Sequence, residues 1–160
     1  MKGIILYRIL SVLVNIFSFF LAISMLFAFP VIFAQPIFAI VFFMMVCVVL
    51  YTWFANIFLK KVLIKKETIS KKTKDLIQVN AIVSMVMCFL IIVPGLILLA
   101  DPKPYFDALD QMMQGQGNAE VTPQMATNQL WVFIICFILL AAHIVWTYLL
   151  IRKNADYIEK

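Results

Sequence analysis

Polar side chains recur at intervals of four residues inside the long apolar stretches of this chain. The pairs are Ser11 and Asn15, Thr52 and Asn56, Asn80 and Ser84, and His143 and Thr147, with Ser18 extending the first. Residues four apart share one face of a helix, so four helices could turn these faces inward and form one polar layer. Such a layer can hydrogen-bond between helices, or it can bind the polar part of a ligand.

His143 is the only histidine and the most chemically versatile member of this polar layer. An imidazole can titrate, coordinate a metal or bind haem. One histidine cannot supply both axial ligands of a bis-histidine haem, and Cys136, on the same helix face, would bring a metal site to only two ligands. We therefore expect a hydrogen-bonded structural histidine, with no metal and no cofactor.

Catalysis and ion-coupled transport usually need ionisable partners that this sequence does not place near His143. The four apolar stretches contain no Asp or Glu, so they offer no carboxylate pair and no chain of titratable groups. There is also no glycine-rich phosphate loop. We expect no catalytic residues in the chain alone, although a partner in a complex could supply the missing groups.

The elements that must position the polar layer are almost wholly apolar. The chain is 65% hydrophobic and 13% charged, whereas a soluble domain is about 45–50% apolar and about 25% charged. Apolar stretches cover residues 7–29, 36–59, 76–100 and 129–151, each longer than the roughly 20 residues that cross a bilayer. They do not alternate as barrel strands do. The sequence predicts an all-α, four-helix bundle in a membrane, forming one domain over residues 1–160.

The positive charges indicate an orientation for this bundle. Lys103 is the single exception among the 13 Lys and Arg residues, because the others lie in the N-terminal segment, the second connection or the C-terminal tail. Positive residues accumulate on the cytoplasmic side. We therefore expect both termini in the cytoplasm, in a bacterial cytoplasmic (inner) membrane, with the polar layer in the cytoplasmic half.

The second connection is strongly basic. Its lysines are Lys60, Lys61, Lys65, Lys66, Lys71, Lys72 and Lys74. They act as the topology signal, and they could also contact anionic lipid headgroups at about 1 kcal/mol each. The segment has no aromatic residues for stacking on bases, so nucleic-acid binding is not indicated.

The other two connections are less charged or acidic. Pro30 and Pro36 enclose a short turn over residues 31–35, and the outer loop covers residues 101–128. In that loop Phe106, Leu109 and Met113 share one helical face, which predicts a short helix on the outer membrane surface.

Three further features carry structural expectations. Tyr7, Trp53, Trp131 and Tyr148 lie near the ends of the apolar stretches and are predicted to be interfacial aromatics. The Pro94–Gly95 pair predicts a kink or an end of the third helix. Cys47, Cys88 and Cys136 lie inside apolar stretches and are expected to pack as small apolar side chains.

Three functions remain open at this point. The first is a non-catalytic accessory or structural subunit of a membrane complex, contacting other subunits or copies of itself through the lysine segment and the outer loop. The second is a small carrier or binder of a lipid or other apolar ligand, with the polar layer holding a headgroup. The third is a membrane enzyme or redox subunit centred on His143.

Overall fold

The computed structural model describes residues 2–34, 37–104, 106–107 and 122–159, and the regular elements in these ranges are helical. The long helices are α1 (Lys2–Ala34), α2 (Ile37–Phe58), α3 (Lys71–Ala100) and α5 (Pro123–Lys153). Stretches long and apolar enough to cross a membrane are Gly3–Phe27, Phe38–Lys65, Lys71–Ala100 and Gln124–Lys153. The predicted all-helical class with four spans of membrane length is therefore confirmed.

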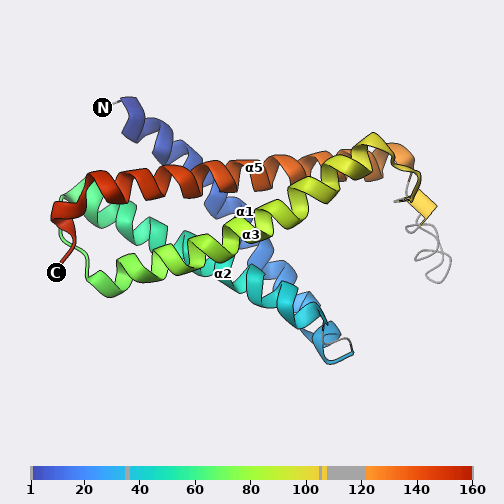
Figure 1. Ribbon diagram of the computed structural model, residues 1–160, viewed down its shortest axis with the longest axis horizontal. Helices are drawn as coiled ribbons and strands as arrows, with labels where there is room; N and C mark the ends of the chain where they lie inside the picture. Colours follow the sequence, from blue (N-terminus) through green and yellow to red (C-terminus); the bar gives the residue numbers. More distant parts are fainter. Residues whose placement is uncertain (1, 35–36, 105, 108–121, 160) are drawn as a thin grey trace.

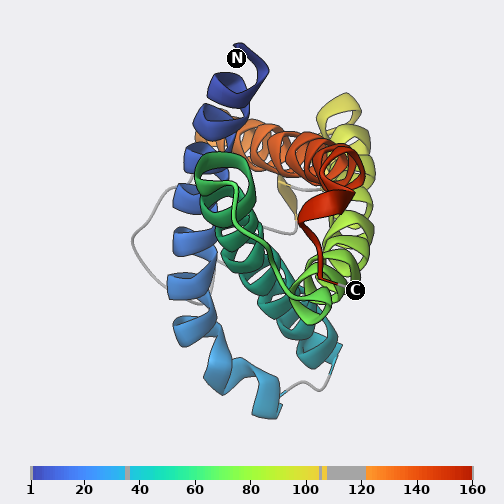
Figure 2. The ribbon, with the colours of Figure 1, turned by 90° about the vertical axis from the view of Figure 1, so that its left-hand side faces the viewer.

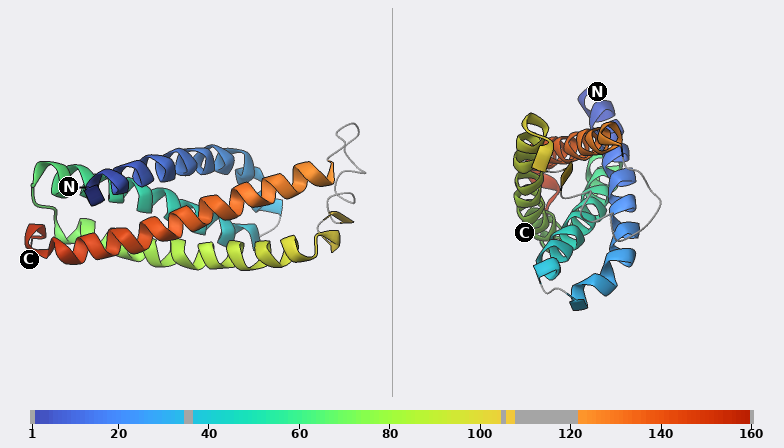
Figure 3. Two further views of the ribbon diagram at one scale, coloured as in Figure 1. Left: turned by 90° about the horizontal axis from the view of Figure 1, so that it is seen from above. Right: turned by 90° about the vertical axis from the view of Figure 1, so that its right-hand side faces the viewer.

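The four helices form two antiparallel hairpins that lie against each other (Figure 1). α1 packs on α2, α2 on α3, and α3 on α5, whereas α5 touches α1 over a shorter stretch. Both termini and the α2–α3 connection lie at one end, which we call the basic end (Figure 3). Towards the opposite, distal end the α1–α2 hairpin diverges from the α3–α5 hairpin (Figures 1 and 2).

Most helices extend beyond the limits predicted from the sequence. α1 continues through Pro30 to Ala34, so the predicted turn is wrong for residues 31–34, while residues 35 and 36 lie outside the described ranges. The proline ring fixes a helical φ angle, and its missing N–H removes one helical hydrogen bond without ending α1. α5 begins at Pro123 instead of residue 129, because the Thr122 side chain accepts a hydrogen bond from the Met125 N–H and Pro123 suits the first turn.

α3 also starts early and runs unbroken through the proline. Ser70 caps its N-terminus by accepting a hydrogen bond from the Thr73 N–H at 3.3 Å. The helix continues through Pro94 to Ala100, so a helix end at Pro94 is excluded. Gly95 is buried, and a Cβ atom there would lie 3.0 Å from two side-chain carbons of Ile134 on α5. The glycine therefore permits a close approach of α3 and α5.

The basic segment after α2 is helical over its first half, where a connection was expected. A π-helix, η1 (Leu59–Lys65), extends α2 and buries the apolar residues Leu59, Val62 and Leu63. These positions recur at helical spacing, which leaves the lysines between them exposed. Lys66 ends the helix in the left-handed region with φ 62°, and the Glu67 N–H donates to the Lys61 carbonyl at 2.9 Å.

The C-terminal tail folds back onto this connection. After η2 (Ala155–Tyr157), Ile158 runs parallel to Ile69 as an isolated bridge. The Ile69 N–H donates to the Tyr157 carbonyl at 2.9 Å, and the Glu159 N–H donates to the Ile69 carbonyl at 3.0 Å. Lys66 lies over the Tyr157 ring at 5.8 Å. The tail thereby connects the end of α5, which carries Arg152 and Lys153, to the basic segment before α3.

The predicted outer helix falls mostly on residues that lie outside the described ranges. Leu109 and Met113 are among them, as are Met112 and residues 114–121. Of the expected apolar face only Phe106 is described, and it is half-buried. The outer helix therefore stays a prediction.

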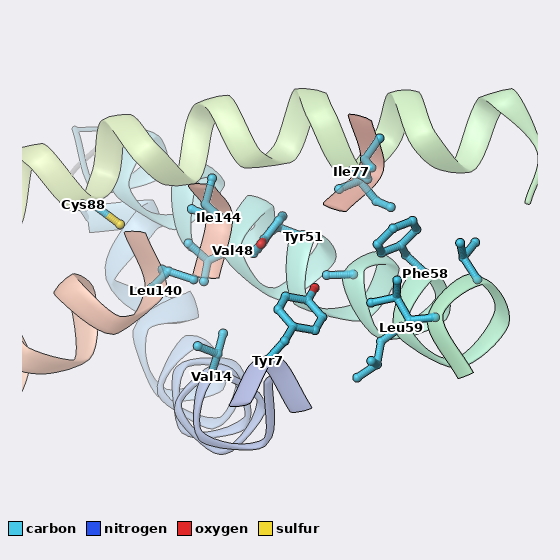
Figure 4. Close-up of a cluster of buried hydrophobic side chains, with 14 of the residues drawn as sticks. Tyr7, Val14, Val48, Tyr51, Phe58, Leu59, Ile77, Cys88, Leu140 and Ile144 are labelled. Atoms are coloured by element: carbon cyan, nitrogen blue, oxygen red, sulfur yellow. The ribbon is translucent and has the colours of Figure 1, made fainter. Parts of the chain in front are cut away.

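Four aromatic residues expected at the membrane interface do not behave alike. Trp53, Trp131 and Tyr148 are exposed, whereas Tyr7 is 0% exposed, so the interfacial prediction for Tyr7 is wrong. The rings of Tyr7 and Tyr51 extend from α1 and α2 into the interior of the bundle (Figure 4). Because α1 begins at Lys2, Tyr7 lies more than a turn inside the helix, not at its end.

The three cysteines lie inside the helices. Cys47 and Cys88 are buried, and Cys136 is half-buried.

Candidate functional site

His143 lies at the centre of the polar layer and contacts two other helices. Its Nε2 atom lies 2.9 Å from the Ser11 hydroxyl on α1, and its Nδ1 atom lies 2.8 Å from the Tyr51 hydroxyl on α2. The Tyr7 ring stacks on the imidazole with centroids 5.0 Å apart and planes 10° apart. His143 is only 2% exposed. Both ring nitrogens are thus occupied by partners within the chain.

Thr147, one turn further along α5, connects the same three helices. Its hydroxyl donates to the His143 carbonyl at 2.7 Å. The Tyr7 and Tyr51 hydroxyls lie 2.8 Å and 2.9 Å from the Oγ1 atom of Thr147. Two tyrosines from α1 and α2 therefore converge on one threonine of α5, in a position with 1% exposure.

Counting hydrogens assigns a direction to each of these bonds. Thr147 uses its single hydrogen on the His143 carbonyl, which can only accept, so both tyrosine hydroxyls donate to Thr147. The Tyr51 hydrogen is then used, and Tyr51 must accept from Nδ1–H of His143. The apolar stretches hold no carboxylate and burial favours a neutral imidazole, so Nε2 accepts from Ser11. The assignment satisfies every polar atom of the cluster with one tautomer.

Two further polar pairs join α1 to α2 alone. Asn15 and Asn56 exchange reciprocal amide hydrogen bonds, with the Asn15 amide donating at 2.9 Å. One turn further along, the Ser18 and Thr52 hydroxyls lie 2.7 Å apart, and Thr52 also donates to the Val49 carbonyl. These pairs continue the stripe that Ser11 begins on α1.

The two polar-layer residues of α3 are buried, but their side chains do not bond to other helices. The Asn80 amide donates to the Leu76 carbonyl of its own helix at 2.8 Å. Ser84 is 0% exposed, and its hydroxyl oxygen has no hydrogen-bond partner. Seven of the nine polar residues singled out from the sequence thus interact between α1, α2 and α5, and the two on α3 stand apart.

Tyr7 and Tyr51 are the members of the cluster that sequence reasoning missed. Tyr7 lies four residues before Ser11, so the same spacing rule extends to it, but its place near the end of an apolar stretch favoured the interface. Tyr51 is next to Thr52 in the sequence and is not four residues away from any of the predicted polar residues, so the spacing rule does not select it. Its inward orientation depends on the stripe of buried residues Val48, Tyr51, Ala55 and Phe58 on α2.

Four of the hollows on the described part of the chain are well formed, and no polar-layer residue lines these four. One of about 450 Å³ lies between α1 and α5, and one of about 260 Å³ between α1 and α2. Two of about 760 Å³ and about 480 Å³ follow the α3–α5 seam. Their walls are mainly apolar side chains, so the space in these four hollows is separate from the polar layer.

The described residues bring no three His, Cys, Asp or Glu side chains together as metal ligands. Cys136 lines the hollow between α1 and α5, while both nitrogens of His143 are engaged elsewhere. The lysines of the basic segment are exposed except for Lys74, which is partly buried, and the ion pair found in the described ranges joins Lys65 and Glu67 at 3.7 Å. Comparison of the chain with protein families, with curated proteins and with solved structures gives no match.

Proposed function

We propose that this protein is a non-catalytic accessory or structural subunit of a membrane complex, with both termini in the cytoplasm of a bacterial cell. The observation that carries the proposal is the self-contained polar layer. Between α1, α2 and α5 its side chains bond to one another, and both ring nitrogens of His143 are engaged within the layer. The layer then serves to hold helices in register.

The proposed orientation rests on the gathering of positive charge at one end. Arg152 and Lys153 in the last turn of α5 lie at the same end as the lysines of η1 and the start of α3, and the bridge between Ile69 and Ile158 holds the tail against that connection. Lys103, after α3, is at the other end. Positive residues are retained on the cytoplasmic side, which supports a cytoplasmic basic end.

The proposed contact surfaces are the basic end and the segment 101–128. Partners would be other membrane subunits or further copies of this chain. The alternative, a carrier that holds a headgroup in the polar layer, has less support because the residues of the layer line none of the four hollows. A redox or catalytic role of His143 would require breaking its bonds to Ser11 and Tyr51.

The test is the composition of the native assembly. The protein would be extracted gently from its own membrane into nanodiscs and weighed by native mass spectrometry. Further protein chains at a fixed stoichiometry are the expected result, and a bare monomer without partner chains would contradict the proposal.

A pair of variants tests the role of the polar layer in that assembly. Asn15→Leu should reduce the yield of the assembly because it leaves the Asn56 amide unpaired. Ser24→Leu is the matched control on the same helix, since Ser24 is exposed and bonds only to the carbonyl of Phe20 in its own helix. Equal yields of the two variants would show that the polar layer has no part in assembly.

A further inference from the structure

Two hollows lie along the outer side of the seam between α3 and α5. The two hollows are adjacent, because Met85 and Val145 line both, and together we call them the α3–α5 groove. Alanines line it where the two helices meet: Ala81 on α3, and Ala141 and Ala142 on α5. Their small side chains leave room between larger neighbours, and the groove reaches Phe89 and Ile138 near the middle of the spans.

The walls of this groove change from apolar to polar towards the basic end. The apolar lining gives way to the amide of Gln78 on α3 and the hydroxyl of Tyr148 on α5. Lys74 and Arg152 lie four residues further along the same two helices, and so on the same helix faces. The order along the seam is hydrocarbon, neutral polar groups, and then cations.

The cations at this end of the groove have few acidic neighbours. Lys71 precedes Lys74 by one turn and Lys153 adjoins Arg152, whereas Asp75 is the carboxylate on the adjoining face of α3. Within the described ranges no ion pair involves these side chains. Asp156 follows Arg152 by four residues, so four cations face two carboxylates near the mouth of the groove, which leaves a net positive charge.

We propose that the α3–α5 groove binds an anionic phospholipid from the membrane leaflet at the basic end. One acyl chain lies along the alanine-lined seam, Gln78 and Tyr148 meet the glycerol region, and Lys74 and Arg152 contact the phosphate. A partner helix laid on the seam would cover the apolar part without using its charged end, so a lipid fits the order of groups better. This inference does not depend on the proposed function.

Native mass spectrometry of the protein in detergent, titrated with phosphatidylglycerol or phosphatidylcholine of identical chains, tests the headgroup part. We expect phosphatidylglycerol to bind preferentially. The double variant Lys74→Gln and Arg152→Gln should weaken its binding roughly 25-fold, because each basic residue near the surface contributes about fivefold. The double variant Lys60→Gln and Lys61→Gln removes the same charge from η1 and should cause a several-fold smaller loss. Equal losses would overturn the site in favour of diffuse attraction.

A second pair of variants tests the acyl part and is independent of charge. Ala142→Phe should fill the groove and abolish retention of the lipid, while Ala22→Phe, which fills the hollow between α1 and α2, should leave retention unchanged. Glycerol 3-phosphate alone should neither bind nor displace the lipid. Unchanged retention in Ala142→Phe, or binding of glycerol 3-phosphate as strong as that of the lipid, would overturn the proposal.

Discussion

The half of the bundle towards the basic end and the distal half are held together by different interactions. Towards the basic end, hydrogen bonds centred on His143 and Thr147 join α1, α2 and α5. In the distal half the contacts are apolar, such as the Phe29 and Phe42 rings 6.1 Å apart within one hairpin, and the two hairpins diverge. In lipid, apolar contact between helices gains little over apolar contact with acyl chains, so directional bonds decide where helices converge.

The largest effect should come from removing the centre of the polar half. His143→Leu leaves the hydroxyls of Ser11 and Tyr51 buried without this partner, so we expect a loss of about 3 kcal/mol in the free energy of unfolding. Reversible unfolding in mixed micelles measures it. Ser24→Ala in the distal half should change stability by less than about 0.5 kcal/mol, and similar effects of the two variants would remove the contrast between the halves.

The distal half should respond to shape instead of hydrogen bonding. Gly95→Leu forces side-chain atoms against Ile134, which overpacks the α3–α5 seam at a cost of about 2 kcal/mol. Adding Ile134→Ala should restore part of the loss. Gly3→Leu is the control, since nothing lies within 4 Å of a Cβ atom there. A Gly95→Leu protein as stable as Gly3→Leu would mean that the close approach is unimportant.

The reciprocal amide pair between α1 and α2 can be measured as a coupling. Asn15→Leu and Asn56→Leu should each cost about 1–2 kcal/mol, because each leaves one amide unpaired. The double variant should cost about 1 kcal/mol less than the sum of the two. Strictly additive effects in a double-mutant cycle would show that the two amides stabilise the bundle independently of each other.

The smallest effect should be found on α3, whose polar residues lie outside the network. Ser84→Ala removes a buried hydroxyl without a partner and should change stability by less than about 0.5 kcal/mol, or raise it. Ser11→Ala, the matched substitution within the network, should cost about 1 kcal/mol because it removes the partner of His143. A larger loss for Ser84→Ala would place α3 inside the network.

The spacing of polar residues predicted which helix faces turn inward, but it did not predict which side chains form hydrogen bonds with each other. Ser11, His143 and Thr147 could be found because residues four apart share a helix face wherever that helix packs. The partnerships of Asn15 with Asn56 and of Ser18 with Thr52 depend on how α1 and α2 cross, which no single segment specifies. Asn80 has the same spacing and bonds to its own helix, because a side chain can choose between a local carbonyl and a distant partner.

The ends of the helices were also only partly predictable, because some depend on local sequence and others on tertiary packing. The N-caps Ser70 and Thr122 are readable in the sequence, yet they lie outside the apolar stretches by which the helices were delimited. Leu59, Val62 and Leu63 have helical spacing, but their burial in η1 depends on tertiary packing that the segment itself does not specify. The α3–α5 groove also required knowledge of which helices are neighbours.

The most direct test of the hydrogen-bonded polar layer is a nitrogen-15 NMR spectrum of the protein in lipid with labelled histidine. Because His143 is the only histidine, the spectrum reports this imidazole alone. The network requires a neutral ring with hydrogen on Nδ1, donating to Tyr51, and none on Nε2, which accepts from Ser11. A single such tautomer that reverses or averages in Tyr51→Phe would support the account. The opposite tautomer, or a rapidly interconverting mixture in the unmodified protein, would contradict it.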